Sequence, residues 1–165
     1  MRRTIAFENL NDAIRECERL LHTGYTRTGN WSLGQICCHL RLTIQCNMDG
    51  YPRWMAMLGY PLRPLLRWFI LPRLLAGESP KGIRTASMFV PPNRLDDDAE
   101  VERLKECVIA FLESPNAMHP HPGFGRMTNR EFNRFHAAHA SHHLSFLHPP
   151  SGPLAIDPRS SHHGD

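Results

Sequence analysis

The sequence lacks the features that would place it in several common classes of protein. Its formal net charge is only +3 over 165 residues, and its lysines and arginines are scattered, which excludes the basic surface typical of nucleic-acid-binding proteins. Internal repeats are absent, and alternating strand-like segments are scarce. Because the aliphatic residues recur with a helical period instead, the sequence predicts an all-α protein. A chain of this length can bury a core within one domain without cross-links.

The cysteines lack the number and spacing that would indicate disulfides or C-x-x-C motifs. They are five, an odd number, and fall inside helical patterns: Cys17, Cys37, Cys38, Cys46 and Cys107. The N-terminal residues MRRTIAFENL contain no apolar core of signal-peptide length. We therefore expect buried thiols in a reducing compartment, with the cytoplasm as the default location.

The most apolar stretch, residues 54–76, lacks the uninterrupted length of a membrane-spanning helix. It contains three prolines and three arginines: Pro61, Pro64, Pro72, Arg63, Arg67 and Arg73. A spanning helix needs about 20 residues with almost no charge. Three interpretations remain, namely an amphipathic insertion that packs on the other helices, a self-association surface, and an element lying on a membrane surface. We expect the first of these, with packing on protein rather than on lipid.

Two segments in the first third of the chain carry the signals of long helices. Asn9 or Asn11 is expected to cap the first, and Ser32 with Gln35 forms a capping box at the start of the second, which should run to about Met48. Apolar residues recur along one side of each. The positions expected to be buried are Leu10, Ala13, Ile14, Cys17, Leu20 and Leu21 in the first helix and Leu33, Ile36, Leu40 and Ile44 in the second.

A long connection separates the second predicted helix from the third. Residues 77–95 are rich in Gly, Pro and Ser, which is typical of an extended segment, and such a segment could cross the end of the helices and cover a site. Residues 96–98 are all Asp, and negative charge is favourable at the N-terminus of a helix. The third helix should end at residues 113–115 and bury Val101, Leu104, Val108, Phe111 and Leu112.

The fourth predicted helix holds most of the residues capable of chemistry. Thr128 and Glu131 form a second capping box, and Pro149 is expected to stop the helix at its far end. At about 100° per residue, three phenylalanines and one histidine fall within about 40° of His139. These residues are Phe132, Phe135, His143 and Phe146.

Two histidines on an apolar helix side can bind one ion or can be hydrogen-bonded core residues. His139 and His143 are four residues apart, so their imidazoles project from adjacent turns. Unpaired imidazoles are costly in a core, which favours ligation, although the Glu of the zinc-protease helix motif is absent. Periodicity alone does not choose between His142 and His143 as the partner of His139.

The remaining histidines are ambiguous. His39 lies about 60° from Ile36, at the margin of the apolar side of the second helix, where a ligand and a half-exposed histidine look alike. His119 and His121 lie in a Pro- and Gly-rich loop, and we expect His119 to face solvent. The tail after residue 148 lacks periodicity and is expected to be disordered. Its two histidines, His162 and His163, are expected to be incidental.

Three sequence segments resemble the DinB/YfiT-like family of metal-binding four-helix bundles. They are GNWSLGQICCHL (29–40), HPGFGRMT (121–128) and HAAHASHHL (136–144). The resemblance covers residues 1–148 as one domain and implies an up-down-down-up bundle, with a helical and extended insertion between the second and third long helices. It also implies a ligand set of one histidine from the second helix and an H-x-x-x-H pair from the last.

Carried over to this chain, the resemblance implies metal ligands at His39, His139 and His143. The contributions of His121, His136 and His142 stay open. Relatives often have Gln three residues after the last ligand, where this chain has Phe146, so any role of that side chain is absent or moved here. The branch of the family in question mostly lacks an assigned function.

Three neutral imidazoles leave a divalent ion with a position for water or substrate, as in catalytic zinc sites. We therefore expect a metal-dependent thiol transferase or hydrolase that uses zinc or nickel, with a low-molecular-weight thiol as the cosubstrate in the first case. The expected partner is a small-molecule substrate, without nucleic acid or membrane, and a homodimer is compatible with residues 54–76. The alternative is a noncatalytic bundle braced by the histidines. No nucleophile set or general base is recognisable from the sequence.

Overall fold

The computed structural model describes residues 2–76, 86–114 and 116–150, and in these ranges the chain is mostly helical. Nine residues of the predicted connection (77–85) and the predicted disordered tail from residue 151, with His162 and His163, lie outside the described residues. The prediction of an all-α class agrees with the described part, apart from one short pair of strands.

Four helices, α1 (Leu10–Thr23), α2 (Leu33–Asp49), α6 (Asp97–Glu113) and α7 (Asn129–Leu144), are the longest elements. Their first residues follow from capping. Asn9, rather than Asn11, accepts from the backbone of α1, and Asp96 does the same for α6. Both predicted capping boxes, Ser32 with Gln35 and Thr128 with Glu131, are formed. Each cap satisfies backbone N–H groups that have no partner inside the helix.

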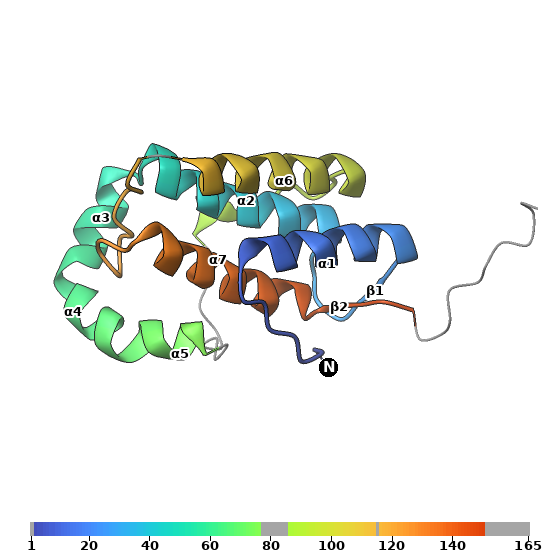
Figure 1. The fold of residues 1–165 in the computed structure, drawn as a ribbon, viewed down its shortest axis with the longest axis horizontal. Coiled ribbons are helices and arrows are strands. Elements are labelled where there is room, and N and C mark those ends of the chain that lie inside the picture. The colour runs from blue at the N-terminus through green and yellow to red at the C-terminus, as the bar shows by residue number, and fades with distance from the viewer. Residues whose placement is uncertain (1, 77–85, 115, 151–165) are drawn as a thin grey trace, which may run out of the picture.

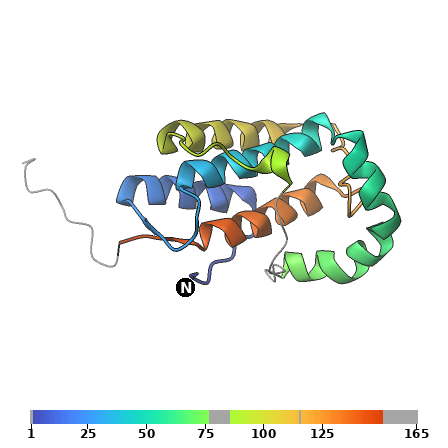
Figure 2. The ribbon, with the colours of Figure 1, turned by 180° about the vertical axis from the view of Figure 1, so that it is seen from behind.

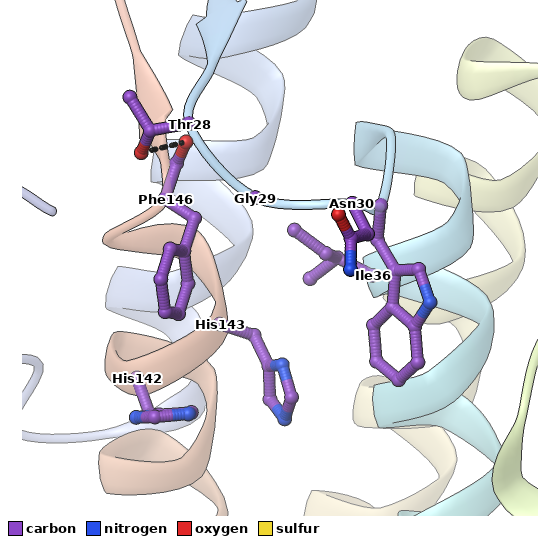
Figure 3. A pocket seen from close by; sticks show the side chains of 8 residues that line it. Thr28, Gly29, Asn30, Ile36, His142, His143 and Phe146 are labelled. Carbon is purple, nitrogen blue, oxygen red and sulfur yellow. Dashed lines mark hydrogen bonds between the residues drawn. The ribbon is translucent and has the colours of Figure 1, made fainter. Parts of the chain in front are cut away.

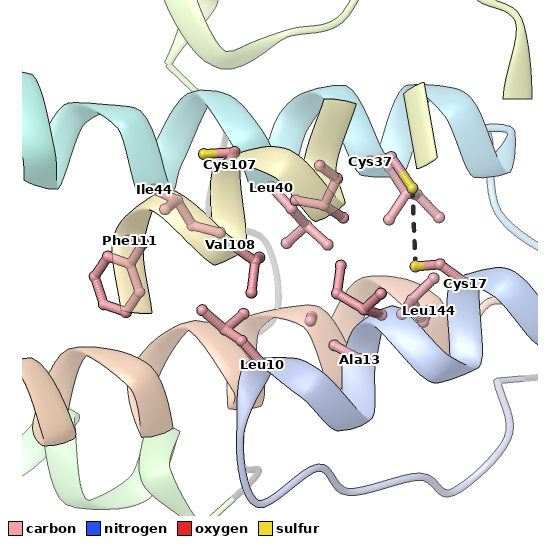
Figure 4. Close-up of a cluster of buried hydrophobic side chains, with 14 of the residues drawn as sticks. Leu10, Ala13, Cys17, Cys37, Leu40, Ile44, Cys107, Val108, Phe111 and Leu144 are labelled. Atoms are coloured by element: carbon pink, nitrogen blue, oxygen red, sulfur yellow. Dashed lines mark hydrogen bonds between the residues drawn. The ribbon is translucent and has the colours of Figure 1, made fainter. Parts of the chain in front are cut away.

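The four long helices lie side by side and enclose the core (Figure 1, Figure 4). The N-terminal ends of α2 and α6 meet, because the Gly34 N–H donates to the Asp97 carboxylate at 2.7 Å. Near their C-terminal ends, the His119 N–H donates to the Asn47 carbonyl at 2.7 Å, so α2 and α6 run in the same direction. The predicted core positions are buried except Leu112, which is 40% exposed, and Leu21, which is partly buried. Leu112 lies on the outer side of α6, where no described element covers it.

Helix α7 ends earlier than predicted, at Leu144 rather than beside Pro149. The following backbone forms strand β2 (Leu147–His148), which pairs antiparallel with β1 (Thr26–Arg27). The Thr28 N–H also donates to the Phe146 carbonyl at 2.9 Å. Hydrogen bonds to a distant segment therefore replace the last helical turn, and Phe146 no longer belongs to the apolar side of the helix.

Residues 53–76 form a curved chain of short helices around one end of the molecule, which we call the arc (Figure 1, Figure 2). Its helices are α3 (Arg53–Gly59), the turn Tyr60–Leu62, α4 (Arg63–Leu65), the π-helical turn Leu66–Ile70 and α5 (Leu71–Leu75). Breaks at proline agree with the expectation of short helical pieces. No helix in the described ranges is long and apolar enough to cross a membrane.

The inner side of the arc is fixed to the loop that precedes α7. Arg63 donates to the Pro122 carbonyl at 2.9 Å, and Arg67 donates to the carbonyls of Phe124 and Arg126 at 2.9 and 2.7 Å. Gly59 is required at this contact, because a Cβ there would lie 2.4 Å from the Pro122 oxygen. The predicted packing of this segment on the rest of the protein is therefore present on its inner side.

Candidate metal centre

Helices α2 and α7 bring three histidines together near the middle of the molecule. His39 comes from α2, and His139 and His143 come from successive turns of α7. One ring nitrogen from each lies within 4.8 Å of the others. The Nε2 atom of His139 is 3.2 Å from Nε2 of His39 and 3.0 Å from Nε2 of His143. The three predicted ligands therefore converge through one ring nitrogen each.

The separations between these nitrogens fit a shared ion. Two imidazole nitrogens about 2.05 Å from one zinc ion in tetrahedral geometry are about 3.3 Å apart. Hydrogen bonding alone cannot satisfy the cluster, because Nε2 of His139 faces two other nitrogens and has one proton or one lone pair to offer. A cation in the centre would satisfy all three lone pairs together.

The tautomer of His39 is set by the segment that covers it. Its Nδ1 lies 2.8 Å from the Phe89 carbonyl oxygen, which can only accept, so Nδ1 carries the proton and Nε2 presents its lone pair to the cluster. The turn Ser87–Phe89 places this carbonyl. The sequence put His39 at the helix margin, but it is only 3% exposed, because residues 86–92 cover that side of α2.

Burial keeps the three imidazoles neutral. It lowers the pKa of His139 and of His143 well below the ordinary value, and the neighbouring imidazoles lower both further. Burial likewise lowers the pKa of His39. Neutral imidazoles have the free lone pairs that metal binding needs, so at neutral pH the cluster is ready to ligate without losing protons.

Trp31 covers the cluster from outside and was not among the predicted site residues. Its ring stacks on His143 at a centroid distance of 5.4 Å and lies 5.0 Å from that of His39. It immediately precedes the Ser32 cap, so the start of α2 fixes its position. The sequence signal that could have pointed to Trp31 is its position as an apolar residue directly before the Ser32 capping box.

The other histidines of α7 have separate partners. Nε2 of His136 lies 2.8 Å from Oδ1 of the buried Asn47, and this contact ties α7 to α2. His142 lies 3.1 Å from the Arg2 guanidinium, which donates to it. The ring of His142 also meets that of His143 edge-on at a centroid distance of 5.0 Å, but only His143 offers a nitrogen to the cluster.

The two loop histidines also lie outside the cluster. His121 stacks on Phe124 and accepts from the Gly123 N–H at 3.1 Å. His119 is exposed, as predicted.

A pocket of about 460 Å³ lies beside the cluster (Figure 3). It lies between residues 28–31, the end of α7 and the start of α2, and its walls are Thr28, Gly29, Asn30, Trp31, Ile36, His142, His143 and Phe146. Of the three converging histidines, His143 reaches this pocket. Phe146, which lost its expected place on the helix, forms part of the wall.

No cysteine takes part in the pocket or the cluster among the described residues. The thiol of Cys37 faces that of Cys17 at 3.8 Å inside the core, and this contact with burial raises its pKa well above the ordinary value. Burial also raises the pKa of Cys38, whose thiol faces Arg41. Both thiols are therefore protonated at neutral pH, in agreement with the expectation of buried, unreactive cysteines.

Acid should destabilise the metal-free protein through its buried histidines. Burial lowers the pKa of His136 to about 3 and that of His121 to about 4. The unfolded chain, with histidine pKa values of about 6.5, binds more protons below that pH. The free energy of unfolding should be highest above about pH 6.5 and fall toward pH 4, by up to about 1.4 kcal/mol per pH unit for each such histidine. Urea unfolding of chelator-treated protein measures this slope.

A variant pair isolates the contribution of His136 to the acid response. His136→Gln keeps a donor for Asn47 and removes the titrating ring, so the slope between pH 6 and 4 should decrease by about one proton. His22→Gln removes a histidine that is exposed on α1 and serves as the control. Equal slopes for His136→Gln and the parent protein would contradict the assignment.

The fold and the cluster together define a helical protein in which one buried and two partly buried histidines form a group suited to a divalent ion. Residues 1–150 match the model of the family described as "Protein of unknown function (DUF1569)", and the chain belongs to that family. No curated protein and no solved structure matches the chain. The resemblance to DinB-like proteins therefore stays a prediction, and function must be argued from the site.

Proposed function

We propose that this protein is a divalent-metal-dependent enzyme whose ion is held by His39, His139 and His143. The observation that carries the proposal is the convergence of three Nε2 atoms, with the two separations from His139 being 3.0 and 3.2 Å. The three imidazoles are neutral and at least partly buried, and the tautomer of His39 is fixed by Phe89. These properties suit zinc or nickel, both of which accept imidazole ligands.

An enzyme is favoured over a purely structural site by the number of donors and by the adjacent pocket. Among the residues that the structure describes, no fourth His, Cys, Asp or Glu joins the three histidines. Structural zinc sites have four protein ligands, whereas catalytic sites have three and an open position. The pocket lined by Trp31 and His143 offers space for a small-molecule substrate next to that position.

The reaction proposed is hydrolysis or the transfer of a low-molecular-weight thiol. A divalent ion in this site would act as a Lewis acid and lower the pKa of a bound water or thiol. The chain itself supplies Trp31, Ile36 and Phe146 as apolar walls that exclude water from one side of the reacting group. His142 is the remaining titratable side chain in the pocket wall, and we assign it no catalytic role.

The finer description of the fold belongs to the same proposal. We propose that residues 1–148 form a DinB-like four-helix bundle of α1, α2, α6 and α7 with up-down-down-up order, in which the arc and the following connection make the crossover. The parallel α2 and α6 support this order. So does the antiparallel α7, whose His136 contacts Asn47 near the end of α2.

The test begins with protein purified without a histidine tag and stripped of metal. Loading with zinc or nickel should give about one ion per chain and an activity, either on simple esters or on an electrophile with added thiol, that the stripped protein lacks. His143→Ala should lose it. Stoichiometric metal without activity in either class of assay would favour the noncatalytic alternative, in which the ion braces α7 against α2.

A further inference from the structure

The arc carries most of the exposed large apolar side chains of the described chain. The eight such side chains in the arc are between 51% and 77% exposed, whereas the four in the rest of the described chain are at most 49% exposed. The eight are Trp54, Met57, Leu58, Tyr60, Leu62, Leu65, Trp68 and Phe69. So many exposed large apolar side chains on one short segment mark an interaction site rather than ordinary surface.

Because these side chains are more than half exposed, we assign them to the outer side of the arc. The inner side packs through Leu66, Ile70 and the buried Leu71 against the core. Arg63 and Arg67 hold that inner side to the loop before α7. The sequence predicted an amphipathic insertion that packs on protein, and the inner half of the arc does so. Of the eight exposed side chains, Tyr60 lies under the Arg63 guanidinium at 5.1 Å, and the other seven are more than half exposed within the described chain.

The charges around the outer side have one sign. Residues 51–76 contain four arginines and no Asp or Glu. Arg63 and Arg67 are used on the inner side. Arg53 and Arg73 are exposed near the two ends of the arc, and neither forms an ion pair with a described residue. The result is a band of Trp, Tyr, Leu, Met and Phe with a free cation at each end.

We propose that the outer side of the arc binds the surface of an anionic lipid bilayer at the depth of the headgroups. Tryptophan and tyrosine prefer this boundary, leucine and phenylalanine insert below it, and arginine pairs with anionic lipid. The short, proline-broken helices can lie in the interface but cannot span the bilayer.

A second copy of the chain fits this surface less well. Two arcs facing each other would bring like charges together, which opposes association. The arc also curves around the end of the molecule (Figure 1), so two arcs would meet over a small area, whereas a bilayer can deform around a convex surface. The arc and the β1–β2 pair, beside which the pocket lies, are at opposite ends of the molecule, so membrane binding would leave the pocket accessible (Figure 1, Figure 3).

Vesicle flotation of the full-length, metal-free chain tests the proposal independently of catalysis. The protein should float with phosphatidylcholine vesicles that contain 30% phosphatidylserine, as a roughly tenfold greater bound fraction than with phosphatidylcholine alone. Added salt should lower the bound fraction, because the arginines act at long range. A wild-type protein that does not float with either vesicle overturns the proposal.

Matched variants locate the binding surface. Trp68→Ser with Phe69→Ser changes two side chains that are 77% and 64% exposed, so folding should be unaffected, and binding should decrease at least roughly tenfold. Ile109→Ser with Leu112→Ser changes exposed apolar residues of α6 and should bind like the parent protein. Equal binding by both variants would overturn the proposal. A parent protein that is dimeric without lipid, and becomes monomeric only in the arc variant, would assign the arc to self-association instead.

Discussion

Replacement of His139 by alanine should reduce bound zinc or nickel from about one ion per chain to nearly none. His139 is the central member of the cluster, since its Nε2 atom contacts the Nε2 atoms of both His39 and His143. Changes to groups that only support a ligand typically cost about 10- to 100-fold in affinity. Removal of a ligand itself should therefore exceed about 100-fold. His143→Ala should behave in the same way.

His142→Ala is the matched control for this experiment. It removes an imidazole from the same turn of α7, but one whose ring meets His143 only edge-on, at a centroid distance of 5.0 Å. Its Nδ1 lies beside the Arg2 guanidinium and is not one of the three converging nitrogens. Elemental analysis and calorimetric titration should show nearly unchanged metal content and affinity for this variant. Circular dichroism checks that all three variants are folded. Equal metal loss in His142→Ala and His143→Ala would refute the assigned ligand set.

The parts of the fold that the sequence predicted well depend on local signals. A capping box joins two residues three positions apart, so Ser32 with Gln35 and Thr128 with Glu131 located two helix starts correctly. The buried stripe of α1 was equally readable, because a helix repeats its apolar side within a few residues. Only the choice between Asn9 and Asn11 needed the structure.

The parts that the sequence predicted poorly depend on distant partners. The end of α7 is set by β1, which lies more than a hundred residues earlier, and no local pattern reveals that pairing. Leu112 is exposed because no element among the described residues packs on the outer side of α6. The exposed apolar side of the arc could not be predicted either, because periodicity shows which residues share a side of a helix but not whether another element packs there.

The candidate site divides in the same way. Periodicity placed His139 and His143 on the inner side of α7. It left His142 as an alternative, because neighbouring residues differ by only about 100° around the helix axis. His39 was ambiguous for a different reason, namely that its burial and tautomer are supplied by Phe89, fifty residues later. A resemblance to other proteins, rather than physical inference, selected those two ligands.

The strongest test of an open site is the entry of an external ligand. Cobalt replaces zinc in sites of this kind, and its visible spectrum reports the donors around it. If the protein supplies only His39, His139 and His143, a low-molecular-weight thiol or azide should bind to the ion with saturation. The thiol should produce new thiolate-to-cobalt charge-transfer bands, whose growth during a titration gives the dissociation constant.

Substitution at the pocket wall tests whether the pocket contributes to thiol binding or whether the ion alone binds the thiol. Trp31→Ala should keep cobalt, because Trp31 stacks on His143 without ligating, but should change the thiol affinity by roughly tenfold through loss of the wall. Ile109→Ala changes an exposed residue of α6 that lines neither this pocket nor the cavity at His139, and it should leave the affinity unchanged. A cobalt spectrum that is indifferent to every added ligand, in protein with one ion per chain, would indicate a fourth protein donor such as His136 or His121. A closed coordination sphere of that kind is structural, so this result would exclude the transferase and hydrolase proposal and leave the ion as a brace between α2 and α7.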